Sequence, residues 1–427
     1  MGAALAVAGR GPRRGRCAFR GDDCDLREQQ RAAPQVSAHS LVSVPRRMKA
    51  ANLAFASSFL THSSRFVFSA RKCITEQRRL SQPQTGKRAC RLVRMSVVPS
   101  AEGSRIVSMP KIDDRVVEGM RLHEFLALEE DKELAKAIEA LFMACKVVGY
   151  EVRTASCNKE ECVNAFGDQQ LAVDLLADRT IEAALRASRV VAIGSSEEQP
   201  IEKDLGGSTF AVAWDPLDGS SIVDTNFSVG TIFGVWRGKR LTGITGRELE
   251  AAGMAVYGPR TSISVSVRGI PGTHEFLLVD NFSGNHGMWV LVQSFYTINE
   301  GKLFAPGNLK ATQDNPGYAK LVQYWMENKY QLRYTGGMVP DCNQILIKGK
   351  GVFANPASPS APAKLRVLYE VAPVAFLIER AGGASSDGER SALDIPIPGT
   401  DVRSQVCYGS KGEVARFNEF VGKRYMK

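Results

Sequence analysis

The fold and the chemistry of this chain depend on the stretch Phe210-Ala-Val-Ala-Trp-Asp-Pro-Leu-Asp-Gly-Ser-Ser221. Its apolar first half, residues 210–214, predicts a short buried strand. Pro216 is expected to end that strand in a turn, because proline cannot donate to a strand ladder. Asp215 and Asp218 then stand three residues apart at the carboxyl end of the strand.

The polar half of the stretch combines two kinds of ligand. The carboxylates of Asp215 and Asp218 suit a hard divalent cation. Gly219, Ser220 and Ser221 offer backbone N–H groups and hydroxyls that suit a phosphate oxygen. A cation site beside a phosphate site is typical of a metal-dependent phosphatase. The alternative for the stretch taken alone is an acidic surface turn without a ligand.

Composition and charge narrow the class of protein. The chain has 427 residues, 44% hydrophobic and 23% charged, as a globular protein does. It has no apolar run of the ~18 residues that a membrane helix needs. Its net charge of +10 is uneven: residues 1–95 carry 19 Lys and Arg against 5 Asp and Glu, and residues 96–427 carry 36 against 40. This mildly acidic body argues against a nucleic-acid-binding protein.

The N-terminal segment, residues 1–95, is rich in Arg, Ser and Ala and lacks apolar periodicity. This composition predicts a disordered organelle transit peptide. The alternative is a basic tail that binds RNA or membrane. A cleaner transit sequence begins at Met48, which is a second candidate for the start of translation.

The rest of the chain mixes helix and strand patterns. Helices are expected at 122–148, 169–187, 318–328, 365–381 and 413–421, strands at 190–193, 228–236, 262–267, 276–279, 288–292 and 406–408, and polar connections at 153–168 and 299–316. The alternation in 262–267 predicts a half-buried strand. Because the order lacks a regular βαβ rhythm, we expect layered α/β rather than a simple doubly wound sheet.

Carboxylates recur where these elements end. They are Asp168, Asp174, Glu197, Glu198, Asp215, Asp218 and Glu370. Mg²⁺ prefers several such oxygen ligands, and it supports phosphate hydrolysis by water. Lys364 and Arg366, just before Glu370, could clamp phosphates; the alternative is an ordinary charged helix end. Zinc, Ser-His-Asp and P-loop chemistry are not favoured, because the required motifs are absent.

Taken together, these motifs resemble those of the fructose-1,6-bisphosphatase family, class 1. The similar blocks, in the family's order over roughly residues 115–425, are 167–174, 196–198, 215–221, 333–338 and 364–370. The runs 222–227, 334–341, 306–308 and 153–157 resemble the sedoheptulose bisphosphatase branch of that family, which serves the Calvin cycle. The resemblance implies an α/β/α/β/α sandwich with two subdomains.

The resemblance also implies a role for each candidate residue. Asp168, Glu197, Asp215, Asp218, Glu370 and the Leu217 carbonyl would hold Mg²⁺; Asp174 and Glu198 would orient and deprotonate the attacking water; Gly219, Ser220, Ser221 and Arg366 would hold the 1-phosphate; Asn308, Tyr334, Lys364 and, from a neighbouring subunit, Arg333 would hold the distal phosphate. Metals would offset charge on the phosphate while the protein supplies positioning.

Departures from the fructose-specific pattern indicate the length of the sugar that the chain accepts. Asn355 stands where fructose-specific members carry a Tyr, and Ala305 and Pro306 replace polar residues. A looser distal pocket would admit a seven-carbon sugar, so sedoheptulose 1,7-bisphosphate is the expected substrate. Fructose 1,6-bisphosphate or dual specificity stays open, since one carbon is weakly discriminated. More distant alternatives are an inositol phosphatase and an inactive sugar-phosphate sensor.

The loop Cys157-Asn-Lys-Glu-Glu-Cys162 has the Cys spacing of the plant sedoheptulose bisphosphatases, which thioredoxin reduces. The resemblance implies a redox disulfide between Cys157 and Cys162; the alternative is two unpaired thiols. It further implies a homodimer in the chloroplast stroma that binds neither nucleic acid nor membrane. The expected layout is a transit segment at 1–95, a metal-binding subdomain with the redox loop at 96–290, and a substrate-binding subdomain at 291–427.

Overall fold

The protein is represented by a computed structural model that describes residues 112–154, 162–163, 169–170, 172–279 and 287–422. The expected transit segment at 1–95, Cys157 and Asp168 lie outside the described residues, and for Cys162 only the backbone is described. Among the helices of the described residues, none has the length and apolar content to cross a membrane.

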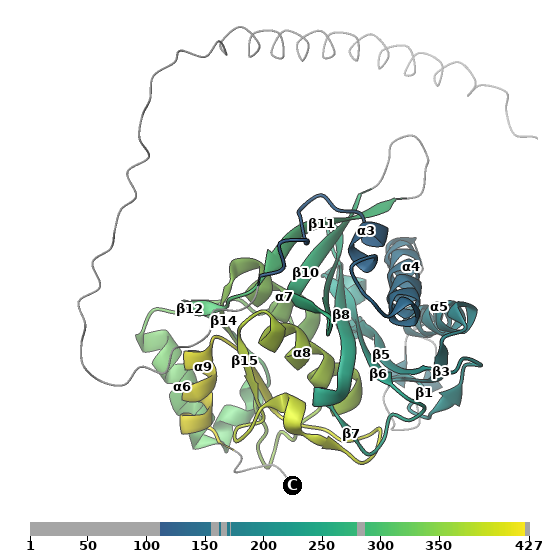
Figure 1. The fold of residues 1–427 in the computed structure, drawn as a ribbon. Helices are drawn as coiled ribbons and strands as arrows, with labels where there is room; N and C mark the ends of the chain where they lie inside the picture. The colour runs from purple at the N-terminus through teal and green to yellow at the C-terminus, as the bar shows by residue number, and fades with distance from the viewer. Residues whose placement is uncertain (1–111, 155–161, 164–168, 171, 280–286, 423–427) are drawn as a thin grey trace, which may run out of the picture. The chain divides into compact units, whose positions relative to one another are not determined.

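A large mixed sheet occupies the first half of the described chain (Figure 1). Its order is β11-β10-β9-β8-β6-β5-β3-β4, and β5 pairs in parallel with β3 and antiparallel with β6. The strands are β3 (Val191–Ser196), β4 (Lys203–Asp204), β5 (Phe210–Asp218), β6 (Val229–Arg237), β8 (Leu249–Tyr257), β9 (Thr261–Val267), β10 (Ile270–Val279) and β11 (Met288–Phe295).

A smaller sheet follows in the second half, with the order β13-β12-β14-β17-β15. Its strands are β12 (Asn299–Pro306), β13 (Gln331–Leu332), β14 (Lys350–Asn355), β15 (Ala384–Ser386) and β17 (Val406–Gly409). Two short ladders join β1 (Cys162–Val163) to β2 (Gln169–Gln170), and β7 (Ile244–Thr245) to β16 (Pro396–Ile397).

Helices fill three layers around the two sheets. Helices α4 (Lys132–Thr154) and α5 (Ala172–Ser188) cover one face of the large sheet. Helices α7 (Met338–Lys348) and α8 (Ala372–Arg380) lie between the sheets and contact both, while α6 (Pro316–Glu327) and α9 (Lys411–Phe420) cover the far face of the small sheet. The layers therefore run α/β/α/β/α, which confirms the predicted fold class.

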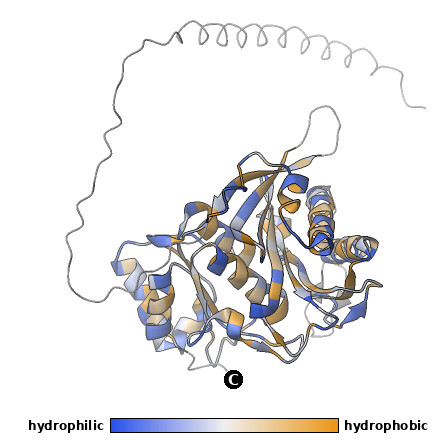
Figure 2. Cartoon of the chain, viewed as in Figure 1, coloured by the Kyte–Doolittle hydropathy of each residue, from blue (hydrophilic) through white to orange (hydrophobic). Residues whose placement is uncertain are grey.

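Three apolar cores lie between the layers, and one of them spans the middle helical layer from one sheet to the other. Along β5, Phe210, Val212 and Trp214 face α4 and α5, while Ala211 and Ala213 face α7 and α8. Both faces of the strand are buried, which is why its sequence is a continuous apolar run instead of an alternating one. Figure 2 shows blue and orange segments side by side in α4 and α5, as expected for helices with one face on a core.

Two expected helices form but are not single α-helices. The pattern at 122–148 forms two helices, α3 (Leu122–Leu126) and α4, because Asp131 caps α4 by accepting the N–H groups of Glu133 and Leu134 at 2.9 and 3.1 Å. The pattern at 365–381 forms a π-helical turn, η4 (Val367–Val371), followed by α8. Helix α7 was missed, because its Gly-Gly start resembles an isolated turn.

Expectations about strands also need correction. Strand β9 is buried along its whole length, since layers cover both faces of the sheet. The connection at 299–316 contains β12, whose second half is buried, followed by the 3-10 turn η3 (Leu309–Gln313). Strand β5 continues through Pro216 to Asp218, so the expected end at Pro216 is wrong. The physical reason is a bulge, which proline tolerates.

Candidate active site

The site begins at the bulge in β5. Asp215 pairs with Ile232 of β6, and the next paired residue, Asp218, opposes Gly230. The intervening residues, Pro216 and Leu217, therefore oppose a single residue of β6. Such a bulge bends the strand and redirects its side chains. The Leu217 N–H donates to the Asp215 carboxylate at 3.0 Å, which fixes that carboxylate beside the bulge.

Asp218 is held by the start of helix α7. Its carboxylate accepts the N–H of Val339 at 2.6 Å, one of the donors that a helix leaves unpaired at its N-terminus. Opposite Asp218, only glycine fits at position 230, because a Cβ there would lie 2.2 Å from the Ala255 carbonyl oxygen and 2.3 Å from Val339. The large sheet and α7 thus meet closely at this carboxylate.

Glu370 comes from the π-helical turn η4, between the two sheets. Its carboxylate accepts the N–H of Arg366 at 2.5 Å. Arg366 is 3% exposed and its guanidinium forms an ion pair with Glu197. A π-helical turn changes the direction of successive side chains within a helix, and such turns are frequent at functional sites.

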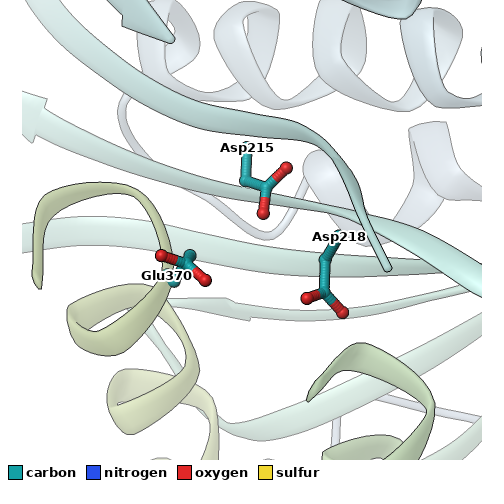
Figure 3. Close-up of side chains that lie close together, drawn as sticks. All are labelled: Asp215, Asp218 and Glu370. Atoms are coloured by element: carbon teal, nitrogen blue, oxygen red, sulfur yellow. The ribbon is translucent and has the colours of Figure 1, made fainter. Parts of the chain in front are cut away.

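Asp215, Asp218 and Glu370 converge in one place, with ligand oxygens within 4.8 Å of one another (Figure 3). Burial, followed by the charges of Asp218, Glu370 and Glu198, raises the pKa of Asp215 well above its usual value. Burial also raises the pKa of Asp218 to about 6 and that of Glu370 to about 7. The fold therefore holds three carboxylates together at an electrostatic cost.

This donor set fits a divalent cation. The oxygens are hard ligands, they are preorganised, and a positive charge among them would relieve the repulsion that raises their pKa values. The Leu217 side chain is buried in the bulge, and Asp174 is buried in the first turn of α5. Glu198 is half-buried, and its charge contributes to the raised pKa of Asp215.

The predicted phosphate turn adjoins the carboxylates. Gly219 has φ 84°, a left-handed conformation that favours glycine, and it begins the 3-10 turn η1 (Ser220–Thr225). Ser220 is half-buried and Ser221 is exposed. Gly337, before α7, lies close to both Gly219 and the Asp218 carboxylate. The turn is thus enclosed by the segment that precedes α7.

The residues predicted for the distal phosphate are more exposed than the carboxylate cluster. Tyr334 is 46% exposed; partial burial, followed by the nearby charges of Asp341 and Asp218, raises the pKa of its hydroxyl. Arg333 and Lys364 are exposed. The amide nitrogen of Asn308 donates to the carbonyls of Pro356 and Ala361 at 2.8 and 3.0 Å, and thereby positions the loop between them.

Two residues near the site were missed in the sequence. Both oxygens of buried Asp341 accept the Thr335 N–H, at 2.9 and 3.1 Å, and so fix the turn before α7. An acidic residue next to Pro340, after a Gly pair, is a helix-start signal that could have revealed it. Arg403 pairs with Arg366 in an isolated bridge, and its charge favours the ionised form of Glu370. No local sequence signal connects Arg403 to the site.

Comparison with known proteins gives a consistent result. Residues 119–294 match the fructose-1,6-bisphosphatase N-terminal domain model, and residues 297–422 match the C-terminal domain model. The chloroplastic sedoheptulose-1,7-bisphosphatase of Spinacia oleracea is 53% identical over 326 residues, which are 75% of this chain and 81% of that protein. The Chlamydomonas reinhardtii protein of the same name is 55% identical over 71% of this chain and 77% of its own.

The chain belongs to the fructose-1,6-bisphosphatase family. The resemblance predicted from the motifs is thereby confirmed. The family fold also recurs in a crystal structure of a Toxoplasma gondii protein assigned as a sedoheptulose-1,7 bisphosphatase, with TM-score 0.65 and 36% identity over 71% of this chain and 98% of that one. Leishmania major fructose-1,6-bisphosphatase has the same TM-score, 0.65, at 27% identity and the same coverage of 71% and 98%.

The raised pKa values of the carboxylate cluster predict the pH dependence of stability without metal. Because the folded pKa values of Asp218 and Glu370, about 6 and about 7, lie above the unfolded values near 4, the native state binds more protons between these limits. This cluster therefore destabilises the protein as pH rises from about 4 to about 7. In EDTA, Asp218→Asn should raise Tm relative to the natural chain, and more so at the higher pH.

The quantity to measure is the difference in Tm between Asp218→Asn and the natural chain. Burial lowers the pKa of His274 to about 4, which gives the opposite slope in part of the same range but is common to both proteins. Differential scanning calorimetry in EDTA across this range measures the effect. If Asp218→Asn were no more stable than the natural chain at the higher pH, the carboxylates would not repel one another as inferred.

Proposed function

We propose that this chain hydrolyses the 1-phosphate of sedoheptulose 1,7-bisphosphate, giving sedoheptulose 7-phosphate and inorganic phosphate, with Mg²⁺ as the cofactor. The observation that carries the proposal is the cluster of buried Asp215 and Glu370 with half-buried Asp218 beside the Gly219–Ser221 turn. The substrate is supported by relatives named sedoheptulose-1,7-bisphosphatase that are 53 and 55% identical to this chain.

The residues divide among three tasks around the scissile phosphate: holding cations, binding phosphate oxygens and activating water. Divalent cations at Asp215, Asp218, Glu370, Glu197 and the Leu217 carbonyl would supply Lewis acidity that offsets the charge of the phosphate. Gly219, Ser220 and Ser221 donate backbone and hydroxyl hydrogens to its oxygens, and Arg366 offers a planar fork. Asp174 and Glu198 orient the attacking water and accept its proton. Asp168 belongs to the proposed metal ligands.

The distal end of the sugar is proposed to lie toward Tyr334, Lys364 and the loop that Asn308 holds. Asn355 ends β14 and adjoins Gly307, whose added Cβ would meet the Asn355 side chain at 3.2 Å. An Asn at this place, smaller than Tyr, leaves room for one more carbon. Arg333 is exposed and is proposed to reach the distal phosphate of the neighbouring subunit in a homodimer.

Side-by-side kinetics test the proposed substrate. We predict that kcat/KM of the full chain with Mg²⁺ is about tenfold or more higher on sedoheptulose 1,7-bisphosphate than on fructose 1,6-bisphosphate, the size of effect that one carbon unit allows. Asn355→Tyr should reduce this ratio by filling the distal pocket. An equal or greater value on the fructose ester would instead assign fructose or dual specificity.

The cellular setting is proposed from the same relatives, two of which are named chloroplastic. We propose that the chain acts in the plastid stroma after its N-terminal segment is removed. There, thioredoxin would reduce a disulfide between Cys157 and Cys162 and so activate the enzyme. The pair lies a few residues before Asp168, which gives oxidation a route to the metal side of the site.

Substitution of one thiol tests the redox proposal. Cys157→Ser should make the activity independent of reduced thioredoxin, because a disulfide with Cys162 can no longer form. Cys407→Ser, which alters a buried Cys of β17 outside the redox loop, is the control and should respond to reduction like the natural chain. The measurement is initial rate before and after reduction; continued activation of Cys157→Ser would exclude this pair as the switch.

A further inference from the structure

The bulge in β5 is supported from β6 by one side chain, Thr231. Thr231 is the residue that Pro216 and Leu217 jointly oppose. Its hydroxyl donates to the Pro216 carbonyl at 2.7 Å. A bulge interrupts the regular ladder of backbone hydrogen bonds between β5 and β6. The Thr231 side chain therefore supplies a hydrogen bond to a carbonyl of the bulge.

A second hydroxyl fixes the first. The Tyr257 hydroxyl lies 2.7 Å from that of Thr231. Since the single Thr231 proton points to Pro216, the tyrosine donates to Thr231 and the hydrogen bonds align in one direction. Thr231 is 0% and Tyr257 4% exposed, within the core between α4 and the large sheet. The buried thiol of Cys145 on α4 lies near Tyr257, and burial followed by this thiol raises the pKa of the tyrosine hydroxyl.

The chain of hydrogen bonds reaches a carboxylate of the site through one peptide group. The carbonyl of the Pro216–Leu217 peptide accepts from Thr231, and the N–H of the same peptide donates to Asp215 at 3.0 Å. A peptide group is planar and rigid, so a hydrogen bond at each edge fixes its rotation. The rotation of this peptide sets the position of Asp215 and the direction in which the chain continues to Asp218.

We propose that Thr231 is a positioning residue for the cation site, with Tyr257 as its support. Thr231 touches no proposed ligand directly; it sets the peptide that carries Asp215. The inference rests on the proposed function only in that the carboxylate cluster holds divalent cations. It predicts that loss of the Thr231 hydroxyl weakens cation binding, whereas an equally destabilising change elsewhere in the core does not.

The chain contains a matched control for a purely structural role. Thr273 of β10 is also 0% exposed, and its hydroxyl donates to the Leu377 carbonyl at 2.6 Å. A second hydroxyl, that of Ser266, lies 2.7 Å away. Thr273 therefore repeats the hydroxyl pair and the carbonyl acceptor, but its acceptor belongs to α8 and not to the bulge.

The test uses the full chain and Mn²⁺ as the probe, with binding measured by isothermal titration calorimetry and Tm measured in EDTA. Thr231→Val should raise the Kd for Mn²⁺ about tenfold, the effect typical of a group that orients a metal ligand. Thr231→Ser keeps the hydroxyl and should restore most of the affinity. Thr273→Val should lower Tm about as much as Thr231→Val does, and it should leave the Kd for Mn²⁺ unchanged.

Tyr257→Phe provides a second variant should Thr231→Val fail to fold, and it should raise the Kd in the same direction. Unchanged Mn²⁺ affinity in Thr231→Val or Tyr257→Phe, with Tm lowered as in Thr273→Val, would overturn the inference. A natural chain that binds Mn²⁺ but hydrolyses neither bisphosphate would contradict the proposed function alone. A natural chain that does not bind Mn²⁺ would overturn the inference as well.

Discussion

Repulsion among three carboxylates, two buried and one half-buried, is the constraint around which the described part of the chain is built. Asp215, Asp218 and Glu370 come within 4.8 Å of one another, and burial with mutual charge raises their pKa values. Such a cluster persists only where surrounding elements hold it, because isolated carboxylates would separate or take up protons. A divalent cation would remove the repulsion among the carboxylates, and the relief of that repulsion would favour cation binding. The cluster therefore defines the site.

Three features hold the carboxylates, and two of them, the bulge and the π-helical turn, depart from ideal secondary structure. A bulge carries Asp215 and Asp218, the N-terminus of α7 donates to Asp218, and a π-helical turn carries Glu370. The regular layers on either side compensate for the stability that these irregular features lack. Since α7 packs against both sheets and η4 packs against β5 and β6, the packing of the layers brings the three carboxylates together.

The sequence predicted the composition of the site better than its construction. The apolar run 210–214 followed by Asp215 and Asp218 predicted a strand with carboxylates at its end, and the ordered motifs predicted the family. Pro216 was wrongly interpreted as a stop, because proline is compatible with either a turn or a bulge. Thr231 gave no signal, since threonine is common in strands for its shape alone. Distances between residues far apart in sequence, such as Asp218 and Glu370, depend on the packing of layers.

Anomalous diffraction from crystals grown with Mn²⁺ tests the account's central claim most directly. The account predicts a peak about 2.1 Å from carboxylate oxygens of Asp215, Asp218 and Glu370, the distance expected for small divalent cations bound by hard ligands. The peak should disappear in Asp218→Asn together with hydrolysis of the bisphosphate. A fully active enzyme whose Mn²⁺ binds elsewhere, with these three carboxylates free of metal, would contradict it.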